Sequence, residues 1–339
     1  MNQRILCFGE IVADLIEGKD GVLMCKVGGA PLNVAVGLGR LGERSTLFSA
    51  VGGDWFGEKG LSYLKSKRIR SIVSTLPDLP TRMTVISHDR NRERSFKFSP
   101  GVAAENAVMP DERTLAGGYE ILYFGSFPFS RGSGLPDFKN FVRSAREAGI
   151  ATVFDPNIRL GIFANQDEAR KICLELLSLS DVVRLNVDEL KFIYGKNSKG
   201  RKQAFVRKAT AWLLAEGPHT VFVTDGPVGS YACRDGEFEF MRSFKVKAVD
   251  STGCGDAFTA AIISKLCDEK DTGAHSSLTQ LLRWANAAGA AAATKLGGAD
   301  SMPTKIDIER LIKSNLRGGG MGKKLVSSRG FSGLRTRIN

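Results

Sequence analysis

The chain has 339 residues, of which 42% are hydrophobic and 25% charged, so it can bury a substantial core and is not intrinsically disordered. Its formal net charge of +12 would favour a nucleic acid or an anionic surface as a partner if that charge were spread over the fold. However, six of the basic residues lie in the segment 317–339, which has no acidic residue, and without them the excess falls from +12 to +6. Half of the excess charge therefore belongs to the C-terminal segment.

The cysteines and histidines form no metal-binding or disulfide pattern. Six cysteines are widely spaced without a C-x-x-C pair, and three scattered histidines have no partner at metal-ligand spacing. This spacing excludes a zinc ribbon and favours a reducing compartment. The apolar run near the N-terminus is too short for a signal peptide, and no apolar run reaches membrane-spanning length. We therefore expect a cytoplasmic protein without a membrane partner.

Short apolar runs separated by glycine turns fill the first hundred residues. Their spacing predicts strands at 5–8, 11–16 and 46–51, a helix that begins near Pro31 and a helix at 56–67. Proline suits the first turn of a helix because an N–H has no intrahelical acceptor there. A small sheet separate from the main one is predicted from the strand around Asp14 and from three further segments: 22–27, 84–87 and 94–98.

From residue 121 onward, predicted strands and helices alternate, which is typical of a parallel sheet covered by helices. The strands are expected at 121–124, 151–154, 182–185 and 220–224, and the helices at 137–148, 166–179 and 201–215. Ligands bind at the carboxyl ends of the strands in such α/β folds. Polar segments follow three of these strands, at 155–159, 186–189 and 224–229.

Each of these polar segments also has a purely structural interpretation. Asn186 can cap a helix with Glu189 as its capping-box partner, and Arg159 can be a solvated surface charge. Gly226 and Gly229 can serve only a turn. Their common position at one edge of the sheet nevertheless favours a ligand site.

A glycine-rich turn at 249–258 leads directly into a helix expected at 257–266. Glycines on both sides of Cys254 allow the backbone N–H groups to face inward, and the helix dipole adds positive charge, so the turn favours an anion. Asp256 lies beside this anion site. A carboxylate there can take a proton from a group that attacks a phosphate, or it can cap the helix, and the turn alone leaves both interpretations open.

The C-terminal part contains one more predicted helix and a change in composition. An alanine-rich helix is expected at 281–295, in which the spacing of Asn286 favours a packing role. After Leu316 the chain is rich in Gly, Ser and Arg, a composition that does not repay the entropy of ordering. We therefore expect a folded domain at 1–313 and a flexible basic tail at 314–339.

Two distant segments carry a resemblance to a known family. The sequence from Gly28-Gly29 to Ala35 and the sequence from Asp250 to Phe258 closely resemble the two signatures of the ribokinase-like carbohydrate kinases, also called the phosphofructokinase-B family. The resemblance covers roughly 4–313. Segments 28–31, 93–98 and 155–159 match the pattern of fructokinases. The family usually has Ala where Cys254 stands and often Thr where Ser251 stands.

The resemblance implies a fold. It is a ribokinase-like three-layer α/β/α sandwich with a mainly parallel sheet and a small β-sheet lid that closes over the sugar. The segments near 11–27 and 81–100 would form the lid. Members of the family are often dimers joined through their lids, so a homodimer is expected.

The resemblance also implies roles for the residues that bind the sugar and transfer the phosphoryl group. Asp256 would take the proton from the sugar hydroxyl, and the anion hole would be formed by the amides of Gly253, Cys254 and Gly255. The sugar hydroxyls would be bound by Asp14, Gly28, Gly29 and Asn33. Arg159 would reach the sugar or the transferring phosphate.

Nucleotide and cation positions follow from the same resemblance. ATP would be contacted by Asn186, Thr224, Gly226 and Gly229, with Asn286 near the adenine. Asn186 and Glu189 match the family's N-x-x-E element, in which Glu189 would organise Mg²⁺ through water. A monovalent cation such as K⁺ would be bound by Asp250 and Thr252.

The leading hypothesis is an ATP-dependent sugar kinase that converts fructose to fructose 6-phosphate. The sequence contains no G-x-x-x-x-G-K-[ST], so the backbone turn must bind the phosphates without a P-loop lysine. The alternative substrates are 2-keto-3-deoxygluconate, ribose and nucleosides. Some sugar-acid kinases have Arg where this chain has Ser99, so the match to that group is weaker. In a different class, the chain would be a non-catalytic protein that binds nucleic acid through its tail, against which the intact Asp256 argues.

Overall fold

The chain folds around one large sheet. A computed structural model describes residues 3–18, 21–88, 94–131, 134–196 and 201–318. Within these ranges the main sheet has nine strands, in the order β13 (Glu237–Arg242), β12 (Gly229–Arg234), β11 (Thr220–Thr224), β10 (Val182–Asn186), β9 (Ala151–Phe154), β8 (Ile121–Phe124), β1 (Ile5–Phe8), β4 (Ser45–Gly52) and β5 (Arg70–Leu76). Neighbours from β11 to β5 are parallel, and β12 and β13 add antiparallel strands at one edge.

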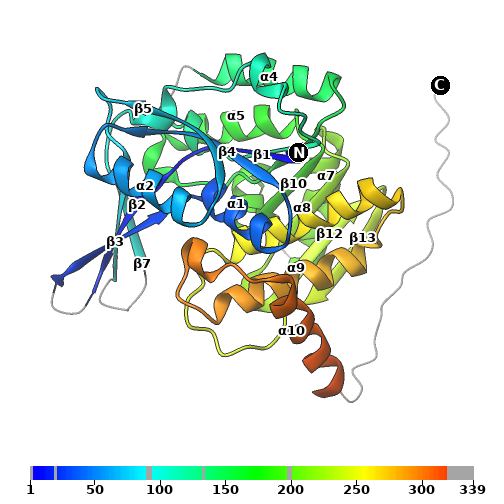
Figure 1. Ribbon diagram of the computed structural model, residues 1–339. Coiled ribbons are helices and arrows are strands. Elements are labelled where there is room, and N and C mark those ends of the chain that lie inside the picture. The colour runs from blue at the N-terminus through cyan, green and yellow to red at the C-terminus, as the bar shows by residue number, and fades with distance from the viewer. Residues whose placement is uncertain (1–2, 19–20, 89–93, 132–133, 197–200, 319–339) are drawn as a thin grey trace, which may run out of the picture.

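Helices cover both faces of this sheet (Figure 1). One face is covered by α1 (Ala30–Arg40), α8 (Cys254–Thr272) and α9 (Leu278–Ala293), and the other by α4 (Leu135–Glu147), α5 (Gln166–Leu177), α6 (Val187–Tyr194) and α7 (Lys202–Ala215). Successive side chains of a strand face opposite sides, so Ile5 and Cys7 join the first core while Leu6 and Phe8 join the second. This arrangement is the three-layer α/β/α sandwich that the resemblance implies, and that prediction is confirmed.

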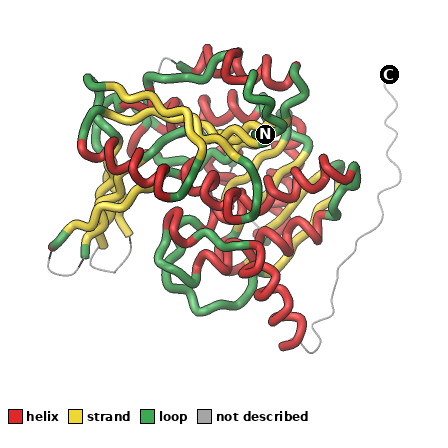
Figure 2. The backbone as a smooth tube through the Cα atoms, viewed as in Figure 1, coloured by secondary structure: helices red, strands yellow, loops and turns green. Residues whose placement is uncertain are grey.

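A second, smaller sheet projects from this body (Figures 1 and 2). In the part of the chain that the structure describes it has four strands, in the order β3 (Leu23–Gly28), β2 (Val12–Glu17), β6 (Arg82–His88) and β7 (Arg94–Phe98). The central strands β2 and β6 are parallel, and both outer strands are antiparallel to their neighbours. The small sheet predicted from the sequence is therefore confirmed.

A buried arginine anchors the base of the small sheet. Arg82, at the start of β6, is only 1% exposed. Its guanidinium donates to the Glu105 carboxylate at 2.8 Å, to the Asn106 side chain at 2.8 Å and to the carbonyl oxygens of Ser99 and Gly101. These bonds join the small sheet to the segment 104–106, which packs beside the main sheet.

Several elements extend beyond the ranges expected from the sequence. The helix expected at 257–266 begins at Cys254, because Gly253 adopts a φ of 82° and provides the N-cap. The helix α10 (Lys305–Gly318) continues past residue 313, where the tail was expected to begin. Residues 319–339 and Glu93 lie outside the described residues. The remaining helices are α2 (Trp55–Ser66) and the short α3 (Glu112–Leu115).

Candidate active site

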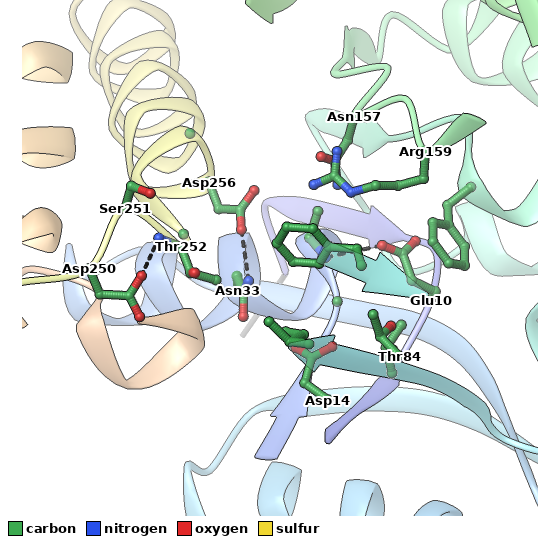
Figure 3. A pocket seen from close by; sticks show the side chains of 18 of the residues that line it. Glu10, Asp14, Asn33, Thr84, Asn157, Arg159, Asp250, Ser251, Thr252 and Asp256 are labelled. Atoms are coloured by element: carbon green, nitrogen blue, oxygen red, sulfur yellow. Dashed lines mark hydrogen bonds between the residues drawn. The ribbon is translucent and has the colours of Figure 1, made fainter. Parts of the chain in front are cut away.

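A cavity of about 660 Å³ lies between the small sheet and the carboxyl ends of the main-sheet strands. The small sheet contributes Asp14, Thr84 and the aromatic rings of Phe96 and Phe98. The opposite wall is formed by residues that follow the strands of the main sheet and by the turn that precedes α8. Figure 3 shows that these side chains point into one shared space. The expectation that the polar loops meet at one sheet edge is therefore confirmed for this part of the site.

Asp256 lies in the first turn of α8 and faces this cavity. The Asn33 side chain donates a hydrogen bond of 2.7 Å to its carboxylate (Figure 3). Asn33 is on α1, whose start is set by Pro31, and its own amide oxygen accepts no hydrogen bond from the described residues. The two segments that carry the family resemblance are 223 residues apart in sequence at this contact, and the fold brings them together.

The structure speaks against one of the two interpretations of Asp256, the helix cap. The N-cap of α8 is Gly253, and no side chain caps the first turn of this helix. The Asp256 carboxylate instead accepts a hydrogen bond from Asn33, and the residue lines the cavity. The helix-cap interpretation is therefore wrong, and the side chain is available for chemistry in the cavity.

Three carboxyl groups around the cavity titrate above their ordinary range. Burial raises the pKa of Asp256 to about 6, while its hydrogen bond with Asn33 and the charges of Arg184 and Arg159 act in the opposite direction. Burial likewise raises the pKa of Asp14 to about 6 and that of Glu10 to about 8. Perturbed groups that converge on one cleft indicate a functional site.

The glycine-rich turn lies beside Asp256. Gly253 and Gly255 line the cavity, and the amide of Cys254 donates to the carbonyl oxygen of Ser251 at 3.2 Å. One of the three amides expected in the anion hole is thus engaged within the turn. Burial raises the pKa of the Cys254 thiol to about 11, so this cysteine remains neutral where the family usually has alanine. A neutral thiol does not repel a phosphate.

The sugar-binding prediction concerns the opposite side of the cavity. Asp14, Asn33 and Arg159 line it, and Figure 3 shows their side chains directed into it. Gly29 also lines the cavity and has a φ of 115°, and a side chain there would overlap the backbone of Glu10. Gly28 is outside the lining, where a side chain would overlap the Asp14 carboxylate. The two glycines therefore let Glu10 and Asp14 approach α1.

Comparison with known proteins assigns the family. The family described as pfkB family carbohydrate kinase matches residues 2–305. The chain belongs to this family of carbohydrate kinases. It is 31% identical over 313 residues to a fructokinase of Salmonella typhimurium, covering 91% of this chain and 99% of that protein. It is 29% identical to probable fructokinase-4 of Arabidopsis thaliana, covering 92% of this chain and 97% of that protein.

The fold of this kinase is also that of solved fructokinases. A crystal structure of fructokinase from Vibrio cholerae O395, with fructose, ADP and a calcium ion bound, superposes with a TM-score of 0.80. It is 26% identical and covers 91% of this chain and 99% of that one. A fructokinase from Xylella fastidiosa with bound ATP gives a TM-score of 0.81 at 24% identity, covering 93% of this chain and 100% of that one. None of the helices described here is long and apolar enough to cross a bilayer.

The N-x-x-E element of the kinase begins α6. Asn186 lines the cavity, and its side-chain oxygen accepts the backbone N–H groups of Asp188 and Glu189 at 2.9 Å. The Glu189 carboxylate accepts the N–H groups of Asn186 and Ile158, both at 2.8 Å. The capping-box interpretation is therefore confirmed. Asn186 lines the cavity and caps the helix at the same time.

The other residues expected to contact the nucleotide lie outside the cavity lining. Thr224 accepts a hydrogen bond of 2.8 Å from Arg184, Gly226 lies in the turn between β11 and β12, and Gly229 is the first residue of β12. Asn286 is buried in α9, where it accepts from Ser230 at 2.7 Å. The packing interpretation of Asn286 is confirmed, and the nucleotide contacts of these four residues stay predictions.

The cation-binding predictions can be compared with the donor atoms present. Both oxygens of Glu189 already accept a backbone N–H, but each keeps a second lone pair to which a magnesium-bound water can donate. The Asp250 carboxylate accepts the N–H groups of Thr252 and Gly297 at 2.8 and 3.0 Å, and both predicted ligands, Asp250 and Thr252, line the cavity. Among the described residues, no group of three or more His, Cys, Asp or Glu side chains could hold a metal by itself.

Two charged residues of the cavity were missed in the sequence. Glu10 is 2% exposed, and one carboxylate oxygen accepts the Ala30 N–H while the other has no partner among the described residues. It lies two residues after the end of β1, so its position near a strand end was a usable signal. Arg184 lies inside β10, and nothing in the apolar pattern of that strand indicates its partners.

Proposed function

We propose that this kinase transfers the γ-phosphoryl group of ATP to the 6-hydroxyl of fructose. The observation that carries the proposal is that proteins named fructokinases match nine tenths of the chain, with Salmonella typhimurium fructokinase at 31% identity and 91% coverage. The fructose named in the Vibrio cholerae structure gives further support, because its fold superposes on this chain with a TM-score of 0.80. Fructose 6-phosphate and ADP are the products.

In the proposed step Asp256 is the general base. Its carboxylate takes the proton of the 6-hydroxyl while that oxygen bonds to the γ-phosphorus and the bond from phosphorus to the ADP oxygen breaks. The amides at 253–255 and the α8 dipole stabilise the negative charge of the transferring group. Asp14, Asn33 and Arg159 orient the sugar, and Gly28 and Gly29 complete the predicted sugar site, with Gly28 giving room to the Asp14 carboxylate. Thr224, Gly226, Gly229, Asn186 and Asn286 are the proposed nucleotide contacts.

We also propose two cations, one bound to ATP and one beside the glycine-rich turn that precedes α8. Mg²⁺ would arrive bound to ATP and would keep part of its water shell, and Glu189 would act on it through water. A monovalent cation beside Asp250 and Thr252 would add positive charge next to the anion-binding turn. The potassium ion named in a second Vibrio cholerae fructokinase structure, at 25% identity, supports this part of the proposal.

The proposal extends to assembly and location. Exposed apolar side chains on β3 and β7, namely Leu23, Met24 and Phe96, support a homodimer joined through the small sheets. The absence of disulfides among the six cysteines of the described residues supports a cytoplasmic location. Sedimentation of the wild type and of a Leu23→Glu, Met24→Lys variant tests the dimer, which the charged variant should dissociate.

A substrate panel tests the proposed activity. Purified protein with Mg²⁺ and ATP is assayed against fructose, ribose, 2-keto-3-deoxygluconate and a nucleoside, with ADP release and sugar phosphate both measured. We expect fructose to give the highest kcat/KM. A higher kcat/KM for any other acceptor would replace the fructose assignment, and ADP release without sugar phosphate would contradict the kinase step.

A further inference from the structure

Arg184 is a buried cation in the middle of the main sheet. It lies on β10, is 8% exposed and lines the cavity. One guanidinium nitrogen donates to the Asp155 carboxylate at 3.1 Å, and another donates to the Thr224 hydroxyl at 2.8 Å. Its Nε has no partner among the described residues. A buried ion pair carries a large desolvation cost, so a pair beside the cavity suggests a functional role.

The pair is connected to the first turns of α8. The hydroxyl of Thr259, which is fully buried, donates to the Asp155 carboxylate at 2.8 Å. A Cβ added at Gly255 would lie 2.7 Å from a guanidinium nitrogen of Arg184. The guanidinium therefore packs directly against the backbone of the residue that precedes Asp256, and a side chain at position 255 would have to displace it.

We propose that Arg184 is a positioning residue that holds the first turn of α8 in place and balances the negative charge of Asp155 next to Asp256. This inference rests on the proposed role of Asp256 as the base. The two charges act as a unit: Asp155 fixes Arg184 and Thr259, and Arg184 supports Gly255. Neither residue needs to touch the sugar for this role.

The charges around Asp256 make the proposal measurable. The ionisable and polar groups that act on or face it from the neighbouring elements are Glu10, Asp14, Asn33, Tyr123, Asp155, Arg159, Arg184 and Cys254. Among them, the charge of Asp155 raises the pKa of Asp256, whereas the charges of Arg184 and Arg159 lower it. Because a base must be ionised to act, losing Arg184 should move the acid limb of the pH profile upward, and losing the Asp155 charge should move it downward.

The experiment compares Arg184→Met and Asp155→Asn in the full-length protein. For each variant, kcat is measured with saturating fructose and Mg·ATP across the pH range, and the Asp256 carboxyl is titrated by ¹³C NMR in the absence of substrates. We expect opposite shifts of about one pH unit, upward for Arg184→Met and downward for Asp155→Asn. Arg146→Met is the matched control, because Arg146 pairs with Asp181 away from the cavity and is partly exposed.

The outcomes separate this inference from the proposed function. Shifts of the same sign in both variants, or unmoved titrations with only a higher KM for ATP, would overturn the positioning role. If Arg184→Met does not fold, the direction of the Asp155→Asn shift decides alone. Undiminished turnover in Asp256→Asn would contradict the base assignment instead, and the NMR titration would still report whether Arg184 acts on that carboxyl.

Discussion

Asp256 combines two properties that a general base needs. It has a fixed hydrogen-bond partner in Asn33, at 2.7 Å, and its pKa of about 6 lies close to the pH at which kinases work. Its neighbours act in opposite directions, since burial raises the pKa while two arginines lower it. The carboxyl is therefore ionised at neutral pH but remains basic enough to take a proton from a sugar hydroxyl.

Replacing this carboxylate should abolish most of the turnover. For Asp256→Asn we expect kcat to fall by about 10² to 10⁴-fold with a small change in KM, because the amide keeps the shape but cannot accept the proton. Steady-state kinetics with fructose and Mg·ATP measure this. Asp111→Asn, which changes an exposed aspartate at the N-cap of α3, should behave like the wild type. Near-normal kcat in Asp256→Asn would refute the base role.

The same substitution should make the protein more stable at neutral pH. The pKa of Asp256 is higher in the folded state, at about 6, than the ordinary 3.8 of an unfolded chain. Ionisation therefore costs the folded state more, and stability falls as the pH rises from 4 toward 6 and stays lower above it. Asp256→Asn should gain about 1–2 kcal/mol near neutral pH and little near pH 4. Denaturant unfolding of the wild type and the variant at pH 4 and pH 7 measures this gain in stability. An equal gain at both pH values would contradict the raised pKa of Asp256.

Among the elements, the small sheet depends on one buried ion pair. The side chains of Arg82 and Glu105 are 1% and 2% exposed and lie 2.8 Å apart. Arg82 joins β6 to the segment that follows β7, so it fixes the base of the sheet that carries Asp14 and Thr84. The position of this wall of the cavity therefore depends on a contact outside the cavity.

A double-mutant cycle tests this anchor. Arg82→Met should destabilise the protein by about 3–5 kcal/mol, because it leaves Glu105 buried and unpaired, and it should raise KM for the sugar. Arg82→Met with Glu105→Leu should cost less than the sum of the two single changes. Arg113→Met, in an exposed pair with Asp111, should change stability by less than about 0.5 kcal/mol. Additive effects in urea unfolding would show that the pair does not act as a unit.

The sequence predicted the strands of the main sheet's centre better than its edges. The buried strands β8 and β9 consist mainly of apolar residues, and both were placed at their observed bounds. At the edges, β5 and β13 mix charged and apolar residues because they are partly exposed, and no strand was predicted there. Local patterns indicate burial on both faces but do not reveal pairing at an edge.

The candidate site was predictable where residues follow strands or where the family resemblance extends to them. Asn33 and Asp256 belong to the two signature segments, Asp14 was named from the wider resemblance, and all three line the cavity. Arg184 was not, because its role depends on Asp155, which lies 29 residues away and directly follows the neighbouring strand β9. Such pairings arise from strand order, which composition and spacing do not encode.

For the molecule as a whole, a large share of the excess positive charge follows α10, because residues 319–339 contain five basic residues. The segment 319–339 begins where α10 ends, and it contains no acidic residue. A chain truncated after Gly318 should retain kcat/KM for fructose, because the cavity is formed by earlier residues. The full-length chain should bind DNA weakly and lose that binding steeply with salt. Loss of kinase activity on truncation would assign the segment a catalytic role.

We propose that phosphoryl transfer takes place in the cavity between the small sheet and α8, with Asp256 as the base. The most direct test is a crystal structure with fructose, Mg²⁺ and a non-hydrolysable ATP analogue. We predict the 6-hydroxyl oxygen within about 2.6–3.2 Å of the Asp256 carboxylate and the γ-phosphate against the amides at 253–255. A γ-phosphate bound away from that turn, or a 6-hydroxyl directed away from Asp256, would contradict the account.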